Sequence, residues 1–60
     1  MLLNRRVLNM DRYNIVFRHN GYNHKIGDNG VYEFTFDKAM EICYYYRNIG
    51  VNLFILKLNN

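Results

Sequence analysis

The sequence predicts an α+β domain in which a small antiparallel sheet carries one helix on one face, in the order β-β-β-α-β. Three observations predict this fold. Apolar and polar residues alternate on both sides of the dipeptide Asn20-Gly21, as they do in a hairpin. Apolar residues then recur with the period of a helix over residues 37–48. Residues 51–58 follow as a short apolar run, which is typical of a buried strand.

Length and composition limit what such a domain can be. Sixty residues with a net charge of +3 form one domain at most, and a chain this short buries only about 60% of its unfolded surface. We expect that such a domain needs a disulfide, a bound metal or association with another chain in order to be stable. Cys43 has no second cysteine to pair with, and a lone cysteine favours a reducing compartment. With no apolar run near the roughly 18 residues of a membrane span, we predict a cytoplasmic protein without membrane contact that forms a homodimer or binds another protein.

The single domain is predicted over residues 13–60, after a leader or short extra element over residues 1–12. Its first strand covers residues 13–19, whose alternate members share an apolar face. Asn20-Gly21 supplies the positive φ angles of a type I′ turn, so residues 22–26 form the second strand. The two-residue turn pairs His19 with Tyr22, Phe17 with His24 and Ile15 with Ile26.

The next turn determines the third strand. A two-residue loop would place Glu33 and Thr35 on the core face, so we predict the three-residue loop Asp28–Gly30, with Gly30 left-handed in a bulge. The alternative is one long loop over residues 20–30, which is long for a compact domain. The predicted third strand pairs Ile26 with Tyr32, His24 with Phe34 and Tyr22 with Phe36.

A helix is predicted to begin at Asp37, whose carboxylate can accept an N–H of the first turn as an N-cap, and to end at about Asn48. Gly50 is the expected left-handed residue after the helix, followed by the apolar Val51. The last strand, residues 51–58, is apolar on both faces, which predicts burial on both sides or contact with a partner. The buried stripe of the helix is Ala39, Ile42, Cys43 and Tyr46.

Candidate residues for chemistry are few. His19 and His24 fall on one sheet face, but a metal site needs a third and a fourth ligand, and Glu33 points to the other face. Cys43 lies in the buried stripe, where it is expected to be a small core residue and not an exposed nucleophile. We therefore predict no catalytic residue, no metal and no cofactor, in a protein that is not an enzyme.

The run Tyr44-Tyr45-Tyr46 is the most unusual feature. Consecutive helical residues point about 100° apart, which assigns Tyr46 to the core, Tyr44 to its flank and Tyr45 to solvent. Exposed tyrosines are favoured in protein interfaces, although a tyrosine lying over its neighbours' aliphatic stems explains the pattern equally well. The outer face of the last strand is a rival surface that suits a homodimer. The predicted partner-binding residues are Lys38, Glu41, Tyr44, Tyr45 and Asn48.

Weak nucleic-acid binding is the alternative function. Basic and aromatic residues interleave, as in single-strand platforms, at Tyr13, Arg18, Tyr22, Lys25 and Tyr32. The predicted register, however, assigns the three tyrosines to the face under the helix. The open face then has no aromatic ring, because it carries Asn14, Val16, Arg18, Asn23, Lys25, Val31, Glu33 and Thr35.

The sequence therefore predicts a protein–protein interaction module. Small size and an Asn- and Tyr-rich composition suit the accessory proteins with which phages inhibit or modulate host proteins. This general character favours a bacteriophage source and a host protein as partner.

Overall fold

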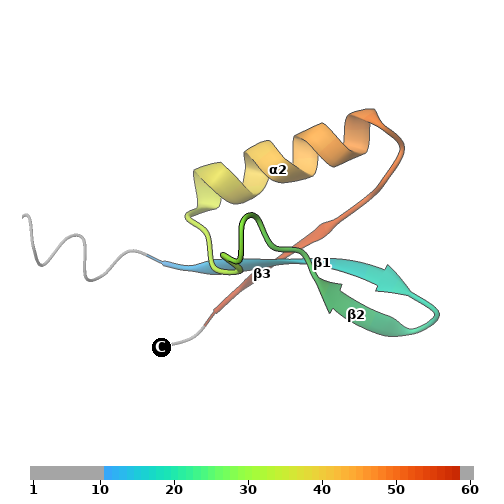
Figure 1. Ribbon diagram of the computed structural model, residues 1–60, viewed down its shortest axis with the longest axis horizontal. Coiled ribbons are helices and arrows are strands. Elements are labelled where there is room, and N and C mark those ends of the chain that lie inside the picture. The colour runs from blue at the N-terminus through green and yellow to red at the C-terminus, as the bar shows by residue number, and fades with distance from the viewer. Residues whose placement is uncertain (1–10, 59–60) are drawn as a thin grey trace, which may run out of the picture.

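The computed structural model describes residues 11–58. It contains strands β1 (Tyr13–His19), β2 (Tyr22–Lys25) and β3 (Phe54–Lys57) and helix α2 (Phe36–Asn48). The strands form one antiparallel sheet in the order β2-β1-β3, and α2 lies on one face of it (Figure 1). For residues 11–58, the α+β class, the small antiparallel sheet and the one helix on its face are confirmed. The order β-β-β-α-β is matched only roughly, because no strand forms between β2 and α2 in this part of the chain.

Most of the predicted leader lies outside the described residues. Its last two residues, Asp11 and Arg12, lie beside the end of β3. The backbone C=O of Arg12 accepts the N–H of Leu58 at 2.8 Å, and Asp11 forms an ion pair with Lys57 at 3.4 Å. These two residues therefore extend the β1–β3 pairing beyond the strands themselves.

The first hairpin has the predicted register. Asn20 and Gly21 have φ angles of 52° and 81°, as both central positions of a type I′ turn require. The pairing continues one residue past β2, because the N–H of Ile26 donates to the C=O of Ile15 at 2.8 Å. His19 lies opposite Tyr22, and Phe17 lies opposite His24.

The predicted three-residue loop and the third strand after it are wrong, although Gly30 is left-handed as predicted. Asn29 and Gly30 have φ angles of 53° and 81°, and Asp28 and Val31 exchange two backbone hydrogen bonds of 2.8 and 3.0 Å. This is a second two-residue turn with the chemistry of Asn20-Gly21. The chain then leaves β2, so none of the three pairings predicted for residues 32–36 forms.

Phe34 occupies the place beside β1 that β2 leaves open. It exchanges two backbone hydrogen bonds with Tyr13, of 2.8 and 2.9 Å, and its side chain is buried. The side-chain amide of Asn14 donates to the C=O of Tyr32 at 2.7 Å, which fixes the same segment. One bridge therefore anchors this stretch, and the neighbouring rings of Tyr32 and Phe36 stay about half exposed.

The helix begins at Phe36, and its N-cap is Thr35 instead of the predicted Asp37. Thr35 is extended, and its hydroxyl accepts the N–H of Lys38 at 3.2 Å. The bridge at Phe34 holds the chain extended, so Thr35 is the first position at which the chain can turn. Asp37 lies in the first turn, where a carboxylate is favoured by the helix dipole.

The helix ends at Asn48, as predicted. Gly50 has φ of 90°, and its N–H donates to the C=O of Arg47 at 3.0 Å. The N–H of Val51 donates to the C=O of Tyr46 at 2.9 Å. These two bonds form a Schellman motif, which reverses the chain so that β3 runs back along α2 (Figure 1).

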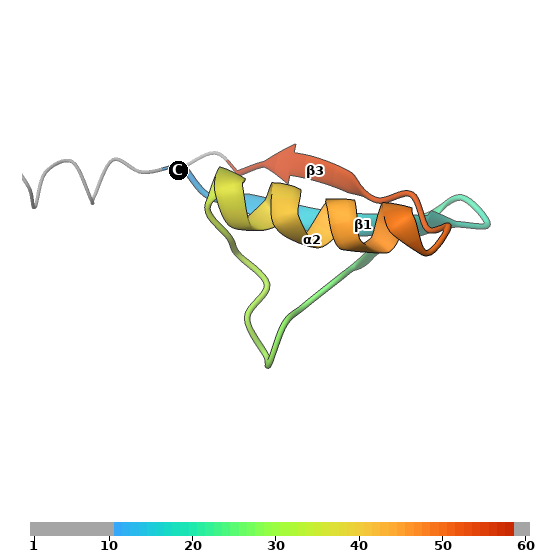
Figure 2. The ribbon, with the colours of Figure 1, turned by 90° about the horizontal axis from the view of Figure 1, so that it is seen from above.

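The core lies between α2 and the β1–β3 half of the sheet. Its buried side chains are Ile15, Phe34 and Ala39, with Ile42 and Cys43 packed against them. Figure 2 shows α2 along β1 and β3, while the segment between β2 and α2 extends on the side opposite β3. Within the described chain, α2 packs against β1 and β3 but makes no contact with β2.

The structure corrects three further details of the prediction. Tyr22 and Tyr32 were expected under α2, but they are 71% and 48% exposed because the helix does not cover β2. Tyr46, the last member of the predicted stripe, is half-buried. β3 is also shorter than the predicted strand over residues 51–58.

Candidate interaction surface

The predicted partner-binding residues fall on two opposite flanks of α2. Lys38, Glu41 and Tyr45 line a hollow of about 290 Å³ against the turn that follows β2. Tyr44 lies on the other flank, toward β3. Asn48 is exposed at the end of the helix. The structure therefore brings three of the five residues together and separates Tyr44 from them.

The flank of α2 that faces the turn after β2 carries polar side chains, and several of these side chains contact one another. Lys38 Nζ lies 3.5 Å from Glu41 Oε1, and both side chains are exposed. Such a pair contributes about 0.5 kcal/mol or less. The ring of Tyr45 meets that of Tyr46 edge-on, with centroids 5.4 Å apart. The polar atoms of Lys38 and Glu41 are therefore paired within the helix, while the ring of Tyr45 stays largely exposed.

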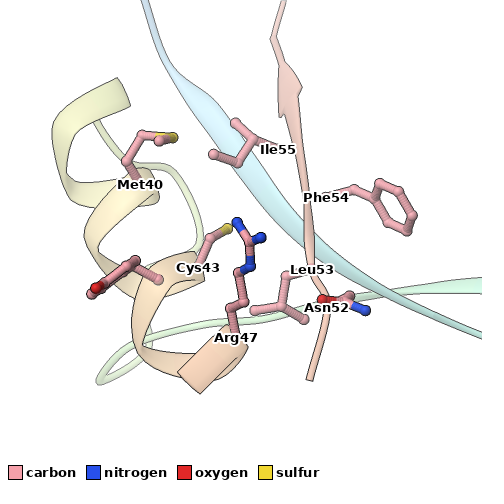
Figure 3. Close-up of a pocket in the computed structure, with 8 residues that line it drawn as sticks. Met40, Cys43, Arg47, Asn52, Leu53, Phe54 and Ile55 are labelled. Carbon is pink, nitrogen blue, oxygen red and sulfur yellow. The ribbon is translucent and has the colours of Figure 1, made fainter. Parts of the chain in front are cut away.

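The flank toward β3 borders an open groove of about 440 Å³. Figure 3 shows Met40, Cys43 and Arg47 extending from α2 toward Leu53 and Ile55. Leu53 and Ile55 are half-buried and pack against the core. The groove is thus an incompletely filled margin of the core, with an arginine at one end.

Large apolar side chains are exposed on both sides of this groove. On α2, Met40 is 48% exposed and Tyr44 is 67% exposed. On β3, Phe54 and Leu56 are about half exposed and point away from the helix, because they alternate with Ile55. We call the groove, Met40 and Tyr44 beside it, and Phe54 and Leu56 on the opposite face of β3 the β3-side surface. Met40 was not among the predicted residues, although its i,i+4 spacing to Tyr44 was a usable signal.

The backbone of β3 also has an open edge. The N–H of Leu58 donates to Arg12, so Leu56 and Phe54 form hydrogen-bonded pairs with β1 in the observed register. By alternation, the N–H and C=O groups of Ile55 and Lys57 point away from β1. No other strand of the described chain lies on that side.

The open face of the sheet carries an aromatic ring that was not predicted there from the sequence. Arg18 lies over the ring of Phe54, with its guanidinium carbon 5.6 Å from the ring centroid. Arg18 Nε also donates to Asn23 Oδ1 at 3.0 Å. The prediction that this face lacks a ring is therefore wrong, because β3 was not placed beside β1. Val31, Glu33 and Thr35 do not belong to this face, since no third strand carries them.

The titratable side chains do not converge on one point. Burial raises the pKa of the Cys43 thiol above its ordinary value, so the thiol is protonated at neutral pH and is a poor nucleophile. His19 and His24 are exposed. Among residues 11–58, no three His, Cys, Asp or Glu side chains lie close enough to hold a metal together. No helix in that range has the length and apolar character to cross a membrane.

Comparison with known proteins adds no relative. Neither a protein-family model, nor a curated protein, nor a solved structure matches this chain. Function must therefore be inferred from the two flanks of α2 and the two faces of the sheet.

Proposed function

We propose that this chain is a small non-enzymatic protein–protein interaction module and that the β3-side surface is its contact site. The observation that carries the proposal is the gathering of Met40, Tyr44, Phe54 and Leu56 around one unpaired sheet edge. Single exposed apolar residues are common on protein surfaces, but apolar patches beside a groove are characteristic of binding sites. Tyrosine, phenylalanine and methionine are also enriched in interfaces.

The small core supports the same proposal. The buried apolar residues of the described chain are Ile15, Val16, Phe34 and Ala39. A domain of this size has little stability to spare, and a partner that binds only the folded state adds to it by mass action. Covering the groove would bury Leu53 and Ile55 more fully and so complete the core.

For the kind of partner, we keep the expectation from the sequence that this protein binds another protein in the cytoplasm. A free, half-buried Cys43 is consistent with a binding protein of a reducing compartment. We therefore extend the proposal to a cytoplasmic protein that inhibits or modulates another protein, in the manner of phage accessory proteins.

Site-specific photo-crosslinking in the native cell tests the proposal. A benzophenone amino acid replaces Tyr44 on the β3-side surface, Tyr45 on the opposite flank, or Tyr22 on β2, all of them exposed tyrosines. We expect protein adducts, with itself or with another protein, from position 44 and few from position 22. If adducts form only from position 45, the contact lies on the flank of α2 that carries Lys38, Glu41 and Tyr45. Adducts from none of the three positions would contradict the proposed function.

Weak nucleic-acid binding is the second candidate. The observation that favours it is the open face, where Arg18 and Lys25 accompany the ring of Phe54. Affinity for a nucleic acid must fall steeply with salt as counterions are released. We expect weak binding at low salt that is lost at physiological ionic strength. Submicromolar binding of DNA or RNA at physiological salt would make this the leading function.

A further inference from the structure

We infer that the partner of the β3 edge is a second copy of this chain, joined antiparallel through β3 about a two-fold axis at Ile55. The two sheets then form one continuous sheet with both helices on the same face. This inference rests on the proposed function, because it names the partner of the β3-side surface. Three independent features of the described residues lead to it.

The first feature is a register that the outward-pointing backbone groups of the edge allow. The outward-pointing backbone groups belong to Ile55 and Lys57. A two-fold axis at Lys57 would set two like charges directly opposite, which is unfavourable. An axis at Ile55 instead pairs Ile55 with itself and sets Phe54 beside Leu56 of the second copy. Each cross-strand contact near the axis is then apolar.

The second feature is the position of α2. The helix contacts both β1 and β3, and Figure 2 shows it above β1 with β3 to one side. With strands about 4.8 Å apart, two copies joined through β3 have helices about 10–14 Å apart. Helices that pack directly lie about 8–10 Å apart, so long side chains are needed to fill the space between them. Met40 and Tyr44 lie on the flank toward β3, so they would meet the helix of the second copy and close the groove.

The third feature is charge. Arg47 lies in the groove near Leu53, at the start of β3 (Figure 3). At the other end of β3, Asp11 and Asp37 line a hollow of about 270 Å³, and Lys57 pairs with Asp11. Antiparallel joining brings Arg47 of each copy to the end that carries both carboxylates of the other. Each end of the dimer interface then holds Arg47 of one copy near Asp11 and Asp37 of the other, which are charges of opposite sign.

A backbone experiment tests the edge without altering any side chain. The chain is synthesised with a methyl group on the backbone nitrogen of Ile55, which removes an outward N–H and blocks the edge. The control carries the same methyl group on Lys25, whose backbone points outward from β2. We expect sedimentation to show wild type and control at twice the 7.3 kDa of one chain. The Ile55 variant should be a folded monomer, with dimer affinity reduced on the order of 100-fold.

A charge exchange tests the orientation. Arg47→Glu alone and Asp11→Lys alone each create like charges at both ends of the joint, so each variant should dimerise on the order of tenfold more weakly. Mixed together, the two variants form a heterodimer in which the introduced glutamate meets the introduced lysine at one end of the joint. At the other end, the native Arg47 of one copy meets the native Asp11 of the other. We expect the mixture to dimerise with wild-type affinity. The circular dichroism spectra of the two variants and of the mixture should match that of the wild type.

The outcomes separate this inference from the proposed function. A folded wild-type monomer at high concentration would overturn the second copy as partner, while foreign adducts from position 44 would leave the interaction module intact. A dimer that tolerates the methylated Ile55 would overturn the β3 edge. A dimer that loses affinity in both single variants without recovery on mixing would overturn the antiparallel arrangement. Loss of dimer only with the Ile55 methyl group and recovery on mixing support the inference.

Discussion

The two edge strands of the sheet, β2 and β3, both pair with β1, but they carry different kinds of side chain. The edge strand β2 is exposed along its whole length, and its outward positions are Asn23 and Lys25. A lysine on an edge strand discourages pairing with another chain. The edge strand β3 carries Phe54, Ile55 and Leu56 in succession and has its one lysine, Lys57, at its end. The two edges of this small sheet therefore differ in character, one polar and one largely apolar, and we propose that only the apolar edge meets a partner.

The helix explains why the two edges differ. α2 packs on β1 and β3, so the apolar inner side of β3 is needed for the core even in a single copy. β2 has no helix above it and is held by the Asn20-Gly21 turn and its pairing with β1. Four mutational and chemical experiments test this difference between the two edges.

The largest difference is expected between two phenylalanines. Phe34 is 5% exposed and bridges to Tyr13, so Phe34→Ala should lower the free energy of unfolding by about 3–5 kcal/mol. Phe54 is 51% exposed on the β3 side, so Phe54→Ala should cost about 1 kcal/mol or less in dilute protein and should weaken association instead. Urea unfolding at low concentration measures both. Equal losses would show that Phe54 belongs to the core of a single copy.

The second test concerns the turn after β2. Gly30 has φ of 81°, so Gly30→Ala should cost about 1–2 kcal/mol. A Cβ added at Gly27 would lie 2.5 Å from the ring of Tyr32, but that ring is about half exposed and can move. Gly27→Ala should therefore cost less, about 0.5–1 kcal/mol. Thermal melting of the two variants should differ in this order, and equal melting temperatures would argue against a left-handed Gly30.

The third test separates the two flanks of α2. Both Tyr44 and Tyr45 are more than 60% exposed, so replacement of either by Ala should change the stability of dilute protein by about 0.5 kcal/mol. Tyr44→Ala should weaken association by about 1 kcal/mol, on the order of tenfold in affinity. Tyr45→Ala should leave association unchanged. Sedimentation of both variants checks this, and a larger effect from Tyr45 would favour the flank toward β2.

The smallest effect is expected at Cys43. Burial raises the pKa of its thiol in the folded protein, so the folded state keeps a proton that the unfolded state releases at alkaline pH. This contribution to stability is complete below the ordinary thiol pKa and is lost as pH rises through the raised value. Alkylation by iodoacetamide should be slower in the folded than in the unfolded protein, and slower still at concentrations where the groove is covered. A rate independent of folding would show that the thiol is fully accessible.

Local chemistry explains the parts of the fold that could be predicted. Asn20-Gly21 determined the first hairpin register, and Gly50 with Val51 determined how the helix ends. The same chemistry was present at Asn29-Gly30, but the prediction assumed that the chain must continue along β2 after the turn. The bridge from Phe34 to Tyr13 is a contact between distant residues, and it also moves the N-cap to Thr35.

The candidate site was predictable only in part, for a related reason. Helical periodicity correctly placed Tyr44 and Tyr45 outside the core. Which of them borders an open edge depends on the strand order β2-β1-β3, and hairpin and helix signals do not encode that order. For this reason the sequence grouped five residues that the folded helix divides between two flanks.

The central position of β1 has a consequence for the order of folding. The hairpin of β1 and β2 closes a two-residue turn, an event of about 1–10 μs. Pairing of β1 with β3 must instead bring together segments separated by roughly 40 residues. We therefore expect β3 to dock late, after the hairpin has formed and α2 has begun to form. The strand that we propose as the dimer edge is thus expected to join its own sheet last, so the sheet edge that a second copy would extend exists only once the core is closed.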